Sequence, residues 1–189
     1  MCVVIEMIIE KAKPLDLKAA REICIKTAND SFKGQNELVT LLYCDYYFLC
    51  QPDLCFVLRK PDGRLAGYVL GAGSERYIQE FNRLFGKKLR KISLKHWCGN
   101  TINMYKYKKM LKKGYDYHLH IDIVEEHTGA GYGKKLMDAL IKKLRMRGAG
   151  GIYLGVASEN ERAIKLYKKC GFVTLKRHAG RLSMGLKFN

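Results

Sequence analysis

The stretch from Tyr115 to Gly133, which reads YDYHLHIDIVEEHTGAGYG, constrains the fold of this chain more than any other. Apolar and polar residues alternate over Tyr117–Ile123, which is the pattern of a β-strand. Glycine then occupies every second position from Gly129 to Gly133, and an apolar stripe at helical spacing follows directly. That stripe consists of Leu136, Met137, Leu140, Ile141 and Leu144. The sequence therefore predicts a strand, a glycine-rich turn and a helix, in that order.

This turn has the chemistry of a phosphate site. Glycine lacks the Cβ that would keep a ligand away from the backbone. The first amides of a helix have no partner within the helix and lie at the positive end of its dipole. The pattern is neither a P-loop, G-x-x-x-x-G-K-[ST], nor the G-x-G-x-x-G turn of dinucleotide-binding folds. A tight strand-to-helix turn without a ligand is the alternative interpretation.

A second pattern lies downstream of the turn. Gly151–Val156 is rich in β-forming residues, and a helix is expected over Glu161–Lys169. The pattern reads Asn160-x-x-Ala163-x-x-Leu166-Tyr167-x-x-x-Gly171-Phe172. Together with the strand and the turn, it resembles the GNAT superfamily of acyl-CoA N-acyltransferases over residues 115–173.

The resemblance implies an α/β (α+β) GNAT fold. Its sheet is mixed and mostly antiparallel, its fourth and fifth strands splay apart, and helices flank it. The resemblance also implies acetyl-CoA as co-substrate, with its pyrophosphate on the turn and its pantetheine arm along the strand. The residues expected to bind it are Ile121, Ile123, Thr128, Gly129, Ala130, Gly131, Gly133, Lys134 and Asn160.

The catalytic residues expected from the same resemblance and from the strand pattern are Tyr167, His120 and Asp122. Tyr167 would protonate the departing thiolate, although a tyrosine at this position could equally pack in the core. His120 or Asp122 would act as the base or bind the acceptor, because both share one face of the expected strand with His118. A structural polar network on that face is the alternative. A strand amide near Ile121–Ile123 would stabilise the oxyanion.

Two positions depart from the family pattern. Thr128 stands where the family has Gln or Arg, and Glu125 stands where proline is frequent. The remaining chain is similar to a narrower group, bacterial proteins that resemble the C-terminal acetyltransferase-like domain of protein O-GlcNAcase. That likeness is carried by LAGYVLGA at Leu65–Ala72, by the long insertion after it, and by HLHID.

Length, hydropathy and cysteine content limit the number of domains, the location and the metal chemistry that we expect. We expect 189 residues to form a single domain, 1–189, with an insertion at about 74–114. No apolar run is long enough to cross a bilayer, and Met1–Ile9 lacks the features of a signal sequence. The seven cysteines include no C-x-x-C, which indicates reduced thiols in the cytoplasm and no metal site.

The net charge of +17 leaves three interpretations open. The charges could be solvated helix faces, could attract the phosphates of CoA, or could bind nucleic acid, the least favoured of the three. For nucleic acid, Tyr105, Tyr107 and Tyr115 would be the stacking groups.

The other expected elements follow from apolar periodicity and turn residues. Strands are expected at Ile5–Lys11, Leu54–Arg59, Leu65–Leu70, Phe172–Lys176 and Arg181–Phe188, and helices at Pro14–Ala28 and Glu37–Leu49. The insertion is too long for a structureless loop, so one helix is expected around Ile78–Phe85 and another at Tyr105–Leu111. Its position suggests that it shapes the acceptor pocket.

Two hypotheses of function follow. The first is an acetyl-CoA-dependent N-acetyltransferase that acts on a primary amine of a small molecule or peptide, as a monomer or homodimer away from membranes. The second is a catalytically weak or inactive module that binds CoA, nucleic acid or protein through its basic surface. The sequence does not identify the amine.

Overall fold

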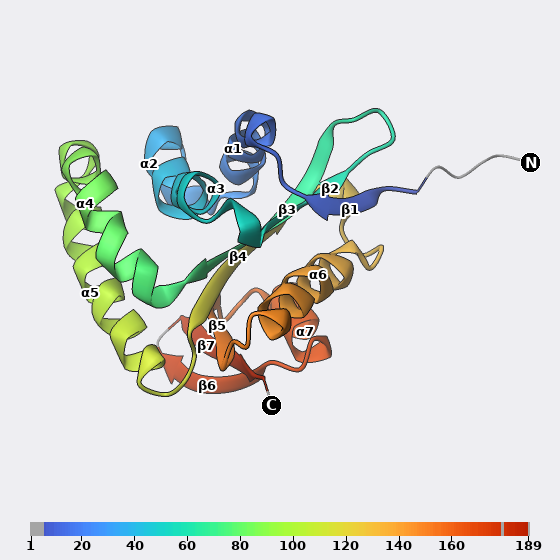
Figure 1. Cartoon of the computed structure of the whole chain (residues 1–189). Helices are drawn as coiled ribbons and strands as arrows, with labels where there is room; N and C mark the ends of the chain where they lie inside the picture. The colour runs from blue at the N-terminus through green and yellow to red at the C-terminus, as the bar shows by residue number, and fades with distance from the viewer. Residues whose placement is uncertain (1–5, 179, 189) are drawn as a thin grey trace, which may run out of the picture. The chain divides into compact units, whose positions relative to one another are not determined.

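The computed structural model describes residues 6–178 and 180–188, and its centre is a seven-stranded sheet. The strand order is β1-β2-β3-β4-β5-β7-β6 (Figure 1). The β4–β5 pair is parallel, whereas β1–β2, β2–β3, β5–β7 and β6–β7 are antiparallel. The sheet is therefore mixed and mostly antiparallel, as the resemblance implies, and the glycine-rich turn follows β4 after one turn of 3-10 helix.

The contacts divide the chain into two compact units. The first unit comprises the residues up to Leu70 together with His120–Leu140, and the second comprises Gly71–Leu119 together with Ile141 onward. Three elements run from one unit into the other: β3 (Leu65–Gly73), β4 (Tyr117–Ile123) and α6 (Tyr132–Met146). The expectation of a single domain stays a prediction.

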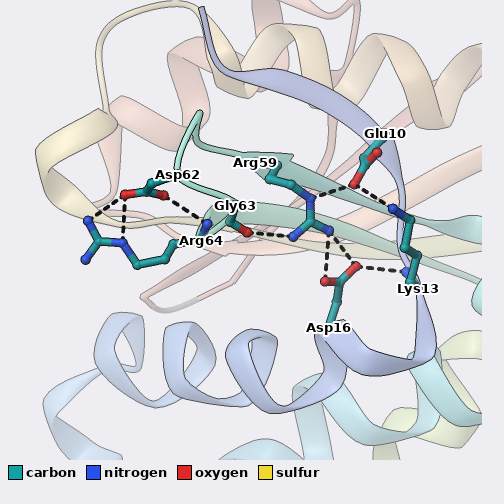
Figure 2. A network of polar contacts seen from close by, with 7 residues as sticks. All are labelled: Glu10, Lys13, Asp16, Arg59, Asp62, Gly63 and Arg64. Carbon is teal, nitrogen blue, oxygen red and sulfur yellow. Dashed lines mark hydrogen bonds and ion pairs between the residues drawn. The ribbon is translucent and has the colours of Figure 1, made fainter. Parts of the chain in front are cut away.

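In the first unit, β1 (Ile8–Lys11) pairs with β2 (Cys55–Arg59), and β2 pairs with β3. Figure 2 shows the polar network that ties these strands to the start of the first helix. Arg59 donates from Nη2 to both carboxylate oxygens of Asp16 at 2.9 Å, from Nε to Glu10 at 2.6 Å, and from Nη1 to the carbonyl of Gly63 at 2.8 Å. Because the guanidinium is held on every side, this network is structural.

The helices of the first unit are α1 (Leu17–Thr27), α2 (Asn36–Thr40) and α3 (Tyr46–Cys50), which lie together in Figure 1. A single α-helix was expected over Glu37–Leu49, and this expectation is wrong in one respect. A π-helical segment, η3 (Leu41–Asp45), joins α2 to α3. The extra residue per turn changes which side chains share a face, and buried Asp45 accepts a hydrogen bond from Arg21 Nε at 2.8 Å.

In the second unit, the beginning of β4 pairs with β5 (Gly151–Ala157), Tyr117 with Ile152 and His118 with Tyr153. Antiparallel pairing then joins β5 to β7 (Arg181–Lys187) and β7 to β6 (Val173–His178). The helix between them, α7, spans Glu161–Lys169 and has the predicted bounds.

The insertion in the second unit is a hairpin of two helices, α4 (Ser74–Ile92) and α5 (Leu94–Leu111). Both helices are much longer than expected, and only Ser93 separates them. Ser93 caps α5 by accepting a hydrogen bond from the amide of His96, and the side chains of Asn100 and Asn82 join the two helices at 3.2 Å.

Some predicted bounds are wrong by a few residues. The first strand begins at Ile8, and the part of that expectation at Ile5 lies outside the described residues. The third strand continues to Gly73 because small residues at its end remain buried in the sheet. The sixth and seventh strands span Val173–His178 and Arg181–Lys187. Among the described residues, no helix combines the length and hydropathy that crossing a bilayer requires.

Candidate active site

Asp122 lies at the centre of a small polar cluster in the first unit. The hydroxyl of Tyr68, on β3, donates a hydrogen bond to Asp122 Oδ2 at 2.6 Å, and Tyr68 itself is fully buried. The hydroxyl of Thr27, at the end of α1, donates to the carbonyl of Ile23 at 2.8 Å, and its oxygen lies near the Asp122 carboxyl. Three segments far apart in the chain therefore enclose this one carboxyl group.

The pKa of Asp122 reflects two opposing effects. Burial raises the pKa of the carboxyl above its ordinary value, and the hydroxyls of Tyr68 and Thr27 lower it, with burial the larger effect. Burial and the nearby Asp122 charge also raise the pKa of Tyr68, so its phenol stays protonated and remains a donor. A raised pKa brings a carboxylate closer to the basicity of a general base that works near neutral pH.

Gly67 lets β3 approach β4 at this cluster. A Cβ on Gly67 would lie 2.7 Å from the carbonyl oxygen of Asp122 and 2.8 Å from Cγ1 of Ile123. Contacts this short do not occur in real proteins, so the close approach of the two strands requires glycine at this position.

His120, one pleat before Asp122, lies between two tyrosines. The ring of Tyr43 meets it edge-on with centroids 5.1 Å apart, and the ring of Tyr47 does so at 5.2 Å. Tyr43 belongs to the π-helical segment and Tyr47 to α3, so the extra residue of the π-helical turn aims both rings at one histidine. Sequence periodicity did not indicate this aromatic pair, or Tyr68, as part of the site.

The glycine-rich turn has the geometry that an anion site requires. Gly129 and Gly131 have φ angles of +85° and +83°, which other residues rarely adopt. An added Cβ on either would meet no atom within 4 Å, so the space over both glycines is open. Within the described part of the chain, no acceptor bonds the backbone amides of the five residues Gly129–Gly133. Together they form a row of free N–H donors at the start of α6.

Two side chains of the turn are already engaged. The hydroxyl of Thr128 donates to the carbonyl of Glu125 at 2.8 Å and so closes the single turn of 3-10 helix, Glu125–His127, before the glycines. Lys134 forms an ion pair with Asp138 at 2.6 Å, one turn further along α6. Both side chains are polar and at the turn, as expected, and their contact with a cofactor stays a prediction.

Asn160 and Tyr167 belong to the second unit. Asn160 is the N-cap of α7, where its Oδ1 accepts a hydrogen bond from the amide of Ala163 at 3.0 Å. Tyr167 is 8% exposed, and its ring packs against Phe172 with centroids 5.9 Å apart. The capping bond uses only Oδ1, so the side-chain nitrogen Nδ2 of Asn160 is left for a ligand. Packing against Phe172 holds the Tyr167 ring in one place.

His118 is buried among the insertion helices. Its ring stacks on Tyr107 at 4.4 Å, meets Tyr77 edge-on at 4.8 Å, and its Nδ1 lies 3.1 Å from the hydroxyl of Ser74. With 2% exposure, His118 joins β4 to α4 and α5 and therefore has a structural role.

The stacking groups expected for nucleic acid are only partly available. Tyr107 is occupied by His118, and buried Tyr115 lies beneath the ammonium of Lys187 at 4.5 Å. Tyr105 is 69% exposed. The expectation is therefore wrong for Tyr115, whose ring is buried in the core, while half-buried Tyr107 has one face covered by His118 and its role stays a prediction.

Cysteine and metal chemistry give no further site among the described residues. No three His, Cys, Asp or Glu side chains there are grouped to hold a metal ion. The six described cysteines are free thiols, of which Cys24, Cys44 and Cys55 are buried and Cys98 is exposed. Cys2 lies outside the described residues. Burial raises the pKa of the Cys24 thiol to about 12, which makes it unreactive at neutral pH.

The protein is thus an α/β protein with a mixed sheet, a parallel β4–β5 pair and a row of free amides after β4. The model of the acetyltransferase (GNAT) family matches residues 24–172, most of the chain. This chain belongs to the acetyltransferase (GNAT) family.

Solved structures share the same fold. The structure of SsHAT superposes with a TM-score of 0.79 at 23% identity, covering 96% of this chain and 98% of that one. PH1933 from Pyrococcus horikoshii OT3 superposes at 0.64 with 19% identity, covering 97% and 99%. The protein yncA from Salmonella typhimurium, solved with its cofactor acetyl-CoA, superposes at 0.62 with 18% identity, covering 97% and 95%. At these identities the likeness concerns the fold alone.

Proposed function

We propose that the protein is an acetyl-CoA-dependent N-acetyltransferase that acetylates a primary amine by direct attack on the thioester. The observation that carries this proposal is the row of five free amides from Gly129 to Gly133, with open space over its glycines. Membership of the family and the acetyl-CoA found in the yncA structure support the choice of acetyl-CoA as the anion.

In this proposal the pyrophosphate of acetyl-CoA accepts hydrogen bonds from the amide row. The positive end of the α6 dipole adds to the attraction. Ile121 and Ile123 offer backbone groups to the pantetheine arm, and Lys134 and Thr128 border the phosphates. The side-chain nitrogen Nδ2 of Asn160, which its capping bond leaves unused, donates a hydrogen bond to acetyl-CoA.

Asp122 is the general base in this proposal. Its carboxyl is enclosed, hydrogen-bonded to Tyr68, and has a raised pKa, which suits removal of a proton from an ammonium group. His120 and its two tyrosines present aromatic faces and edges next to the carboxylate, and they would position the acceptor. An ammonium is attracted both to a carboxylate and to an aromatic ring.

The chemical steps follow from these roles. The ammonium group of the acceptor loses a proton to Asp122, and the neutral amine attacks the thioester carbonyl. A backbone amide near Ile121–Ile123 donates to the oxyanion that forms. The intermediate collapses, the C–S bond breaks, and Tyr167 gives its proton to the CoA thiolate. The extra proton on the nitrogen of the new amide then leaves and restores the phenol of Tyr167, directly or through solvent.

An amine panel with detection of the released thiol tests the proposal. Wild-type protein with acetyl-CoA should release CoA in the presence of at least one class of primary amine, among amino acids, polyamines and peptides. Tyr167→Phe keeps the ring that packs on Phe172 and removes the hydroxyl, so kcat should fall at least about tenfold, since general acid catalysis contributes about 10²–10⁴-fold. The affinity for acetyl-CoA should change little.

The alternatives give different results in this assay. Weaker acetyl-CoA binding at normal kcat would make Tyr167 a binding residue, and an unchanged enzyme would make it a packing residue. Tight acetyl-CoA binding without thiol release on any amine would favour the non-catalytic module.

Three finer hypotheses rest on the sequence alone. They are the similarity to proteins that resemble the acetyltransferase-like domain of O-GlcNAcase, a cytoplasmic location, and a monomeric or homodimeric state. The insertion α4–α5, which follows β3 directly, is the segment that we expect to shape the acceptor pocket.

A further inference from the structure

The hairpin α4–α5 carries most of the excess positive charge of the protein. Residues 74–114 contain twelve lysines and arginines but only two glutamates, so their net charge is +10 out of +17 for the whole chain. All twelve basic residues are exposed. They are Arg76, Arg83, Lys87, Lys88, Arg90, Lys91, Lys95, Lys106, Lys108, Lys109, Lys112 and Lys113.

Most of these charges are not used within the protein. Arg76 pairs with Glu80, Arg90 lies over the ring of Trp97, and Lys88 has another interaction. The side chains of the other nine make no ion pair, hydrogen bond or ring contact with any residue in the described ranges 6–178 and 180–188. Like charges this dense repel one another, which lowers the stability of the free protein. A polyanionic partner would relieve that repulsion.

The charges are also ordered on the helices. Lys106 and Lys109 are three residues apart and so are neighbours on one face of α5, and Lys113 lies in the turn just after the end of this helix. On α4, Arg83, Lys87 and Lys91 are each four residues apart and form a second row. Figure 1 shows the two helices side by side, so the hairpin presents two rows of cations.

A partly apolar groove between the helices adds a second kind of contact. It has a volume of about 340 Å³ and is lined by Ile78, Asn82, Thr101, Met104, Tyr105 and Lys108. The ring of Tyr105 is 69% exposed at this groove, and Lys108 is its neighbour one turn along α5. An exposed aromatic ring beside lysines is the combination with which proteins stack unpaired bases while they neutralise phosphates.

We propose that the hairpin α4–α5 binds single-stranded nucleic acid. The two rows of cations contact the phosphates, and Tyr105 stacks on an unpaired base at the groove. An acidic protein would satisfy the charges but would not need the exposed ring, and a duplex would keep its bases away from it. This proposal does not depend on acetyl transfer.

The test is fluorescence anisotropy of a labelled oligouridine RNA of about 20 nucleotides, longer than most single-strand binding sites. Lys106, Lys109 and Lys113 are changed together to Gln in a hairpin variant. A control variant changes Lys18, Lys33 and Lys168 to Gln, three exposed lysines outside the hairpin, and so loses the same charge. Melting temperatures of both variants confirm folding.

The hairpin variant should bind the RNA at least about tenfold more weakly, and the control variant about as well as wild type. The slope of log K against log salt should fall by about 2 in the hairpin variant, because three phosphate contacts are lost at about 0.7 each. Tyr105→Ala should weaken binding about tenfold, whereas Tyr105→Phe keeps the ring and should bind normally.

Three results would overturn the proposal. An equal loss of RNA affinity in the hairpin and control variants would mean that net charge alone attracts the RNA. If the wild-type protein did not bind the RNA at low salt, single-stranded nucleic acid would be excluded as the partner. Equal competition by poly-glutamate, with no effect of Tyr105→Ala, would make the surface a docking site for an acidic protein.

Discussion

Among single residues, Asp122 is the one whose surroundings decide whether it can act as the proposed base. Burial raises its pKa, and a buried tyrosine hydroxyl limits the rise. A group whose pKa is raised on folding stabilises the protein at acid pH, and that contribution is lost as pH rises through the folded pKa. An ionised Asp122 at neutral pH therefore lowers the stability of the protein, which is understandable if the carboxylate is needed for proton transfer.

Tyr68→Phe should move the acidic limb of the pH profile of kcat/KM to higher pH. The hydroxyl of Tyr68 favours the ionised carboxylate, so its loss raises the pKa of Asp122 further. Tyr46→Phe is the matched control, because Tyr46 is also fully buried and its hydroxyl accepts from Gln51 at 3.0 Å, away from Asp122. In Tyr46→Phe, the acidic limb should lie at the same pH as in the wild-type protein. A limb that moves to lower pH in Tyr68→Phe, or equally in both variants, would contradict the role of Asp122 as base.

The sequence could indicate Asp122 and His120 but could not indicate their partners. Alternation along Tyr117–Ile123 is a local property, so the polar face of β4 is visible in the sequence. Tyr68 reaches Asp122 from 54 residues away, and the two tyrosines at His120 are aimed by a π-helical turn. A contact between residues far apart in the chain leaves no periodic pattern in the sequence, and neither does a change from α-helix to π-helix.

Among the elements, two glycines differ in the space around them. Gly67 lies where β3 touches β4, whereas Gly99 lies within α5, where an added Cβ would meet no atom within 4 Å. Sequence reasoning does not distinguish the two cases, because the difference is the distance to a neighbouring strand.

Gly67→Ala and Gly99→Ala should therefore change stability in opposite directions. The first forces a Cβ against the carbonyl of Asp122, and overpacking of this kind lowers the free energy of unfolding by about 1–3 kcal/mol. The second replaces glycine by alanine within a helix and should raise it by up to about 1 kcal/mol. Thermal denaturation measures both changes, at about 2–4 °C per kcal/mol. A stable Gly67→Ala protein would contradict the close approach of the strands.

Other elements were predictable to different degrees. The bounds of β4 and α7 match the expectation, because β4 alternates strictly and α7 has a capping asparagine and an amphipathic pattern. The helix α5 was underestimated, because its first half contains Gly99 and few periodic apolar residues. It becomes helical by packing against α4, a tertiary effect that local patterns do not contain.

At the scale of the whole molecule, acetyl-CoA binding should be linked to folding. A ligand that binds only the folded chain raises the free energy of unfolding by RT ln(1 + [L]/Kd), about 2.7 kcal/mol at a concentration of 100 Kd. In a chain of this length, that corresponds to a rise in melting temperature of about 5–10 °C. The positive net charge favours the approach of the CoA phosphates.

The rise in melting temperature with acetyl-CoA, compared between Gly131→Glu and Gly63→Glu, tests whether acetyl-CoA binds at the amide row of Gly129–Gly133. Both glycines have a φ of +83° and open space around them, so both variants carry the same backbone strain and the same new charge. Gly131→Glu places a carboxylate on the amide row, where it repels the pyrophosphate, so acetyl-CoA should no longer raise its melting temperature. Gly63→Glu should keep the wild-type rise. A full rise in Gly131→Glu would show that acetyl-CoA does not bind at Gly129–Gly133.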